Sequence, residues 1–201
     1  MEMNNILYLD IPILPAELEK EIIQFGDQLV ATVDPWVENF YQHKIRVAAH
    51  HYGKPDTFLN QDIMDKLKKI YGPYFGNDFV AFIGKLENTY KTGLVENPPH
   101  CDKFRYISIN YLLGLGGDNV LTCFYNESRK SKLMEKGENA LHKDLTLNYK
   151  IRLPKHTWHS FNVQCFHSVE NIETSRLILS LVLLDNPEFN TFKEKYKNII
   201  K

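Results

Sequence analysis

Residues 176–184 read Arg-Leu-Ile-Leu-Ser-Leu-Val-Leu-Leu, a short and strongly apolar stretch that begins with an arginine. Its length and its branched side chains predict a buried β-strand. Five further segments upstream are equally short, rich in β-branched or aromatic residues, and separated by turn residues. Such a series is typical of a β-sandwich, barrel or jelly roll. These segments are 79–86, 106–113, 120–125, 145–151 and 157–163.

Helices are expected on either side of this β-rich region. Apolar residues recur at helical spacing over 16–30 and again over 57–71, where Gly72-Pro73 is expected to end the helix. A third helix is predicted over 187–200, and short strands over 5–9 and 44–49. The sequence therefore predicts a mainly β protein with flanking helices.

The chain contains no internal repeat and no linker, so we expect one domain over 1–201. Within it, the sequence predicts a helical and strand extension over 1–77, a β core over 78–185 and a C-terminal helix over 186–201. The polar segment 126–144 interrupts the strand series. It is either a solvated loop, in which Arg129 and Lys130 face water, or a lid over a site at the mouth of the sheet.

Composition excludes several classes of protein. The chain has 201 residues, of which 43% are hydrophobic, and a net charge of −1, so it is not an extended disordered chain. Near-neutral charge makes a nucleic-acid partner unlikely, since phosphate contacts need clustered cations. No signal peptide and no apolar run of roughly 18 residues are visible, so we expect a cytoplasmic protein without a membrane segment. The sequence does not fix the oligomeric state.

Two histidines and one aspartate have the residue types of a metal site. His100 and Asp102 are two positions apart in Pro-Pro-His-Cys-Asp, just before a predicted strand, so both side chains project to the same face. His167, between apolar neighbours, supplies a third ligand downstream. Two imidazoles and one carboxylate with open positions form the facial triad of non-haem Fe(II) oxygenases. His156 and His159 are rivals of His167 for the third position.

Arg176 stands nine residues after His167, at the head of the apolar strand. Burying an unpaired guanidinium is costly, so this arginine needs an anionic partner. A planar guanidinium matches a carboxylate with two parallel hydrogen bonds. The sequence therefore predicts a carboxylate-bearing ligand at Arg176.

In that order, His100-Cys101-Asp102, His167 and Arg176 resemble the HxD…H…R pattern of the 2-oxoglutarate- and Fe(II)-dependent dioxygenases. The prolyl 4-hydroxylase-like branch is the most similar. The resemblance covers roughly residues 78–184, and it implies a double-stranded β-helix, or jelly roll. It is also carried by Tyr90, Arg105, Ser108 and Leu112-Leu113, which stand where that branch has a co-substrate tyrosine, an arginine, a hydroxyl residue and an apolar pair.

The resemblance implies that His100, Asp102 and His167 hold Fe(II) and that Arg176 binds the far carboxylate of 2-oxoglutarate. Tyr90 and Ser108 would help to bind the co-substrate, and Asn110 shares the inward face of a regular strand with Ser108.

The expected reaction is hydroxylation of an unactivated C–H bond in a peptide or small molecule, with O₂ consumed and succinate and CO₂ released. Arginine at position 176, where many prolyl hydroxylases have lysine, favours the broader superfamily over a prolyl substrate. Two other hypotheses remain: a cupin-like metalloprotein with non-oxidative chemistry, and a non-catalytic binding module.

Overall fold

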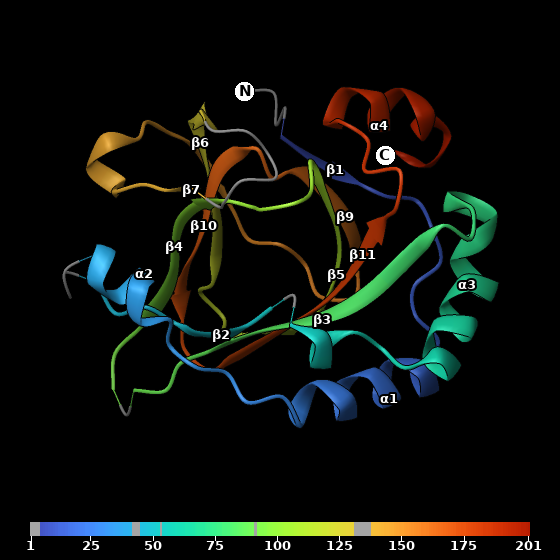
Figure 1. Ribbon diagram of the computed structural model, residues 1–201, viewed down its shortest axis with the longest axis horizontal. Helices are drawn as coiled ribbons and strands as arrows, with labels where there is room; N and C mark the ends of the chain where they lie inside the picture. Colours follow the sequence, from blue (N-terminus) through green and yellow to red (C-terminus); the bar gives the residue numbers. More distant parts are fainter. Residues whose placement is uncertain (1–4, 42–44, 53, 91, 131–137) are drawn as a thin grey trace.

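Two antiparallel sheets make up most of the computed structural model, which describes residues 5–41, 45–52, 54–90, 92–130 and 138–201 (Figure 1). The larger sheet has the order β1 (Ile6–Tyr8), β9 (Trp158–Asn162), β5 (Ile107–Leu115), β11 (Ser175–Leu183), β3 (Phe79–Glu87) and β2 (Ala49–His51). The smaller sheet has the order β7 (Glu138–Asn139), β4 (Val95–Cys101), β10 (Cys165–Ile172), β6 (Leu121–Ser128) and β8 (Leu147–Ile151).

The two sheets face each other across an apolar core that includes Leu112 and Ile178 from the larger sheet and Phe124 from the smaller one. Neighbouring strands come from distant parts of the sequence, as where β11 lies between β5 and β3. This is the jelly-roll arrangement, and it confirms the fold class predicted from the short alternating strands. The space between the sheets is where a ligand site can be built.

Helices cover the outer face of the larger sheet (Figure 1). Side chains from these helices share one core with the outward-facing residues of β3, β5 and β11, and Trp158 of β9 is fully buried among them. Among the residues that the structure places, no helix combines the length and apolarity needed to cross a membrane. The helices of this layer are α1 (Ala16–Asp27), α3 (Gln61–Phe75) and α4 (Phe189–Lys195). The short helix α2 (Pro35–Phe40) lies apart from them, near β4 (Figure 1). The 3₁₀ turns are η1 (Pro55–Thr57), η2 (His142–Asp144) and η3 (Lys197–Ile199).

Helix α3 differs from its sequence prediction at both ends. It begins at Gln61, where the Asn60 side chain accepts a hydrogen bond from the Ile63 N–H, and it runs through Pro73 to Phe75. Proline inside a helix costs about 3 kcal/mol. Here Tyr71 and Phe75 are both buried against the sheet, and their burial offsets that cost.

Other elements also depart from the predictions. The predicted strand over 44–49 is displaced to β2, and α2 was not predicted; it begins at Pro35, with Asp34 as its N-cap. The closing helix is shorter than 187–200, because α4 ends at Lys195 and a 3₁₀ turn follows.

Strands β4 and β10 were missed altogether, and His100 lies on β4 rather than before a strand. Prolines are rare inside sheets because they cannot donate a ladder hydrogen bond. In β4, Pro98 and Pro99 are accommodated by a register shift against β10: His167 pairs with His100, but Val169 pairs with Asn97. This irregularity hides the strand from a sequence pattern.

Candidate metal centre

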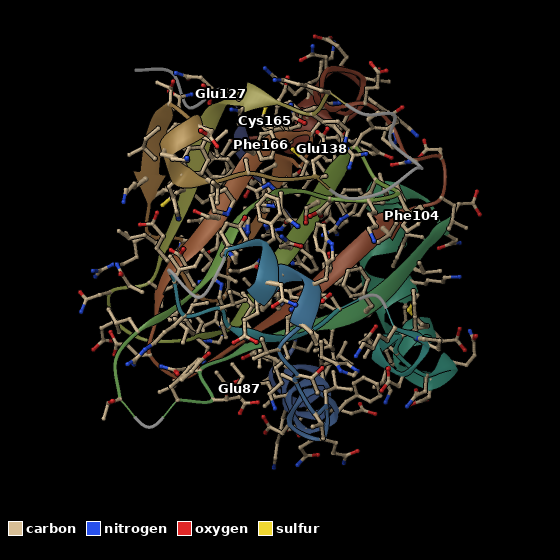
Figure 2. All side chains as sticks on the ribbon, turned by 60° about the vertical axis from the view of Figure 1, so that its left-hand side comes forward. Glu87, Phe104, Glu127, Glu138, Cys165 and Phe166 are labelled. Atoms are coloured by element: carbon tan, nitrogen blue, oxygen red, sulfur yellow. The ribbon has the colours of Figure 1, made fainter. Side chains whose placement is uncertain are left out.

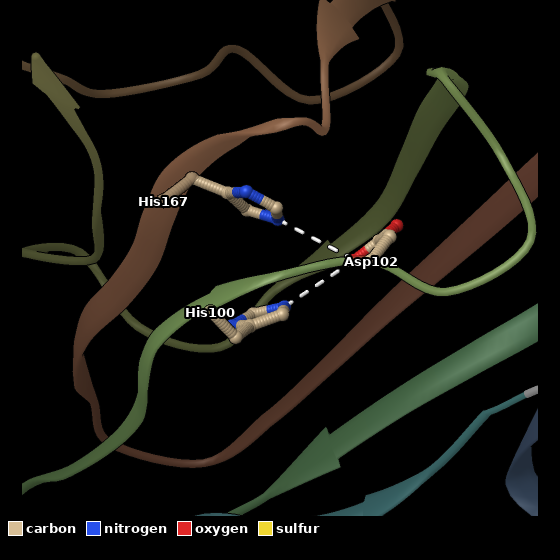
Figure 3. Close-up of side chains that lie close together, drawn as sticks. All are labelled: His100, Asp102 and His167. Atoms are coloured by element: carbon tan, nitrogen blue, oxygen red, sulfur yellow. Dashed lines mark ion pairs between the residues drawn. The ribbon is translucent and has the colours of Figure 1, made fainter. Parts of the chain in front are cut away.

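Three side chains converge between the two sheets: His100, Asp102 and His167 (Figure 3). His100 and His167 are direct cross-strand partners on β4 and β10, and their ring centroids are 4.4 Å apart. Asp102 follows β4 immediately, and its Oδ1 lies 3.5 Å from His100 Nε2 and 3.7 Å from His167 Nε2. One ligand atom from each residue lies within 4.8 Å of the others. The arrangement can hold a single metal ion.

Backbone carbonyls fix the orientation of both imidazoles. His100 Nδ1 lies 2.8 Å from the Pro98 carbonyl oxygen, and His167 Nδ1 lies 3.1 Å from that of Cys165. A carbonyl can only accept, so each Nδ1 carries the proton and donates it. This leaves the lone pair on each Nε2, directed at the centre, as is usual for metal-ligating histidines.

Asp102 is held at both its backbone and its side chain. Its N–H donates to the Val163 carbonyl, and its own carbonyl accepts from Arg129. Arg105 donates from Nε and Nη2 to Oδ2, each at 2.7 Å. Oδ1 is the carboxylate oxygen that faces the two imidazoles. The carboxylate is therefore preoriented with one oxygen paired and the other directed at the centre.

The protonation states suit a cation. Burial alone would raise the pKa of Asp102, but Arg105 and the two histidines outweigh it and hold that pKa well below its usual range. Burial, together with the neighbouring His100, lowers the pKa of His167 to about 4. At neutral pH the site offers one carboxylate and a neutral His167 imidazole. The donor set, two nitrogens and one oxygen, fits Fe(II) or another first-row divalent ion.

Arg176 is buried, with 3% of its surface exposed, and projects between the sheets from β11. Its guanidinium donates to the Leu115 carbonyl at 3.2 Å and to Thr122 Oγ1 at 3.5 Å. Within the described part of the chain, no carboxylate pairs with it and its Nε has no hydrogen-bond partner. Burial lowers its pKa to about 10, so it stays charged at neutral pH. A buried cation of this kind has the chemistry to pair with an anion.

Tyr52 is the residue that sequence reasoning missed. It follows β2, is partly buried, and lies against Gly84, where a Cβ would overlap the phenol ring. The charges of Arg176 and Asp102 both act on its hydroxyl, and burial raises its pKa. Tyr52 is therefore a protonated phenol within electrostatic reach of both Arg176 and Asp102. In the sequence, the one sign of this packing is the glycine at position 84, which leaves room for a ring. A glycine alone does not indicate which residue packs against it.

Tyr90, the tyrosine expected at the co-substrate, is placed by local contacts. It lies in the loop after β3, its N–H donates to the Asn88 side chain, and its ring packs against the Arg46 guanidinium. It is 37% exposed. Its role at a co-substrate therefore stays a prediction.

Ser108 and Asn110 are buried on β5 and face the interior, as alternation along the strand predicts. Ser108 Oγ donates to Asn110 Oδ1 at 2.7 Å, and Ser180 Oγ donates to the same oxygen at 2.8 Å. Arg105 Nη1 donates to Ser180 Oγ at 2.8 Å. A continuous hydrogen-bond network therefore runs from Ser108 through Asn110, Ser180 and Arg105 to the Asp102 carboxylate. Ser108 and Asn110 are thus linked to the metal-ligand cluster (His100, Asp102 and His167) through Arg105.

The two rival histidines lie elsewhere. His156 is half-exposed and pairs with Glu19 on α1, at 3.0 Å. His159 is buried on β9 and stacks with Phe161, and burial lowers its pKa to about 3. Part of the segment predicted as a loop or lid, 131–137, lies outside the described residues. Its neighbour Arg129 contacts Asp102 and so does not simply face water.

No protein-family model matches the sequence, and no curated protein is similar to it in sequence. Solved structures do match. SnoN, a non-haem α-ketoglutarate-dependent epimerase from nogalamycin biosynthesis, superposes with a TM-score of 0.55 at 14% identity, over 89% of this chain and 78% of its own. A SnoN complex with Fe³⁺, α-ketoglutarate and nogalamycin RO superposes with a TM-score of 0.52 at 11% identity, with the same coverage of both chains.

A prolyl hydroxylase from Trichoplax adhaerens, in complex with a fragment of hypoxia inducible factor, gives a TM-score of 0.50 at 12% identity, over 98% of this chain and 87% of its own. The chain shares the fold of these enzymes. The resemblance to the 2-oxoglutarate- and Fe(II)-dependent dioxygenases, drawn from the HxD…H…R pattern, is thereby confirmed at the level of the fold.

Proposed function

We propose that the protein is an Fe(II)- and 2-oxoglutarate-dependent dioxygenase that hydroxylates a C–H bond of a peptide or small molecule and releases succinate and CO₂. The observation that carries the proposal is the pairing of two features. One is the cluster of His100, Asp102 and His167, and the other is the buried Arg176 without a carboxylate partner among the described residues. The Tyr52 hydroxyl lies within electrostatic reach of both Arg176 and Asp102.

The three residues of the cluster would hold the iron. Two imidazoles and one carboxylate would leave further coordination positions of the ion open to other ligands. Bound iron and 2-oxoglutarate would supply the oxidising chemistry with O₂, while the protein orients the reactants and excludes water. The Pro98 and Cys165 carbonyls orient the imidazoles, and Arg105 orients the carboxylate.

Arg176 would hold the far carboxylate of 2-oxoglutarate, and Tyr52 would donate a second hydrogen bond to it. Both are positioned before any ligand arrives: Arg176 is anchored to Leu115 and Thr122, and Tyr52 packs over Gly84. Ser108 and Asn110 act differently from the sequence expectation. Their hydrogen bonds run to Ser180 and thence to Arg105, so we assign them to positioning Asp102.

The substrate class rests on analogy with proteins of the same fold. SnoN is described in complex with nogalamycin RO, and the prolyl hydroxylase with a peptide. The described interior of this chain offers an aromatic wall beside the cluster: Arg105 lies over the Phe82 ring at 5.5 Å, and Phe58 packs against Phe82 towards solvent. This wall favours a substrate with an apolar part.

The test is succinate formation by the purified protein supplied with Fe(II), a reductant and 2-oxoglutarate. We expect metal-dependent succinate formation that increases with the right substrate and is absent in Asp102→Ala. The exposed carboxylate Asp118 provides the control, since Asp118→Ala should retain the activity. A folded, metal-loaded protein that leaves 2-oxoglutarate unchanged would instead favour a cupin-like metalloprotein with non-oxidative chemistry.

A further inference from the structure

A second group of metal-ligand types lies on the other face of the smaller sheet, outside the jelly-roll interior. The segment around β7 and η2 covers this outer face: Ala140 and Leu145 pack on a cluster formed by Cys101, Cys123, Tyr125 and Phe166. Glu138 of the covering segment, labelled with Phe166 in Figure 2, is the cross-strand partner of Cys101 on β4. Polar groups between the cover and the sheet are therefore partly removed from water.

Glu96 of β4, Glu170 of β10 and His142 of η2 meet in this layer. One ligand atom from each lies within 4.8 Å of the others, a condition that the His100, Asp102 and His167 cluster also meets. The side chains of Glu96 and Glu170 are 17% and 16% exposed, and that of His142 is 37% exposed. Two donors belong to the sheet and one to the cover, so an ion bound here would join the two.

The imidazole of His142 is oriented as a metal ligand would be. Its Nδ1 lies 2.9 Å from the Tyr125 hydroxyl, which lies 3.2 Å from Ser168 Oγ. Its Nε2 faces Glu96 Oε1 at 3.0 Å. Ligating histidines usually have their second nitrogen fixed by such a partner. The Tyr125–Ser168 pair thus holds the ring with Nε2 directed at the carboxylates.

Charge balance is consistent with a divalent ion. Glu96 faces His142, whose pKa its carboxylate raises, and Glu170 Oε2 pairs with Lys150 Nζ at 2.7 Å. The two carboxylates together match the charge of one divalent ion. An ion bound between them would displace the half-exposed Lys150 ammonium into water.

We propose that Glu96, His142 and Glu170 form a second, structural metal site that takes a zinc-like divalent transition-metal ion and pins the covering segment to the smaller sheet. Mixed imidazole and carboxylate donors suit Zn²⁺, with water completing the coordination. The site is independent of the proposed oxygenase activity. It shares strands β4 and β10 with the His100, Asp102 and His167 cluster, but it lies on their opposite face.

The experiment is calorimetric titration of the metal-free full-length chain with Zn²⁺ at neutral pH. We expect two equivalents to bind to the wild type, and one to Asp102→Ala. His142→Ala and Glu170→Gln should each lose the other equivalent while keeping the first, which also shows that these variants fold. His156→Ala, which removes a half-exposed histidine elsewhere, should keep both.

Lys150→Ala separates a metal site from a plain ion-pair cluster. Removing the competing ammonium should tighten Zn²⁺ binding at the second site roughly tenfold, because a like charge is taken away from the ion. A wild type that binds one equivalent, lost in Asp102→Ala, together with no additional Zn²⁺ binding in Lys150→Ala, would overturn the proposal. That result would leave the proposed oxygenase function untouched.

Discussion

At the scale of single residues, Arg176 is unusual in carrying a buried positive charge without a carboxylate partner among the described residues. Such a charge costs several kcal/mol in the ligand-free protein. We therefore expect Arg176→Met to stabilise the metal-free, co-substrate-free protein by about 1–2 kcal/mol, or roughly 2–8 °C in melting temperature. The same change should weaken 2-oxoglutarate binding roughly a hundredfold or more.

Arg105 provides the matched control, because its guanidinium is already paired with Asp102. Arg105→Met removes the partner of a partly buried carboxylate, so the melting temperature should fall. Thermal melts of the two variants, with and without 2-oxoglutarate and Mn²⁺, measure both effects. A destabilised Arg176→Met protein with unchanged 2-oxoglutarate affinity would contradict the role assigned to Arg176.

His159 gives a pH dependence whose sign follows from burial. Burial lowers its pKa to about 3 in the folded chain, against about 6.5 when unfolded. Between these values the unfolded state binds one more proton than the folded state. The contribution of His159 to the free energy of unfolding is therefore complete above pH 6.5, and it falls by about 1.4 kcal/mol per pH unit on acidification. His159→Gln, which cannot titrate, should lose less stability between pH 6.5 and 4.5 in urea unfolding. Parallel losses in both proteins would contradict this explanation.

Residue types and spacing indicated His100, Asp102 and Arg176, because few side chains combine metal-ligand or anion-binding chemistry with a strand context. The choice of His167 over His156 and His159 came from the resemblance to the dioxygenases. Tyr52 could not be found in that way. It comes 124 residues before Arg176 in the chain, and only the pairing of β2 with β3, and of β3 with β11, brings it close. Tyr90 matched a pattern, but its position depends on where β3 ends.

At the scale of elements, β3 presents Gly84 to the interior so that the Tyr52 ring can lie against the strand. Gly84→Ala would push the ring away from Arg176 and Asp102. We expect this substitution to weaken 2-oxoglutarate binding by roughly tenfold, the value of one hydrogen bond to a charged group. In a Tyr52→Ala background, Gly84→Ala should have little further effect. Additive losses of affinity, measured by calorimetry, would show that Gly84 acts through another residue.

The elements that the sequence predicted well are those with regular patterns: β3, β5 and β11 alternate or run apolar without interruption. Strand β4 contains two adjacent prolines and a register shift, and β10 carries the polar residues His167, Ser168 and Glu170. The apolar pattern is interrupted in both. The strands that carry the metal-ligand cluster were therefore the strands that pattern reasoning missed.

At the scale of the whole molecule, the prediction of a single domain rests on continuous packing from the helices through the larger sheet to the smaller one. Helices α1, α3 and α4 share one core with the larger sheet, whose inner face packs against the smaller sheet. We expect one cooperative unfolding transition. Trp36→Phe leaves Trp158 as the single tryptophan, so its fluorescence reports the helix–sheet core while far-UV circular dichroism reports both sheets. If the two signals changed at different urea concentrations, the chain would unfold as two units and the single-domain prediction would be wrong.

The jelly roll itself could be predicted from short strands and turn residues, because that pattern can be read from local sequence. The order of strands across the two sheets could not, because it depends on which distant strands pair. Only that order places β11, with Arg176, opposite the sheet that carries His100 and His167. The proposed function depends on this arrangement more than on any one residue.

The most direct test of the proposed function is an anaerobic optical titration of the metal-free protein with Fe(II) and then with 2-oxoglutarate. Chelation of iron by the keto acid gives a visible charge-transfer band, so we expect a band that requires both additions. It should be lost in His167→Ala and should need far more 2-oxoglutarate in Arg176→Met. Tight Fe(II) binding by the folded wild type without any such band would contradict the account.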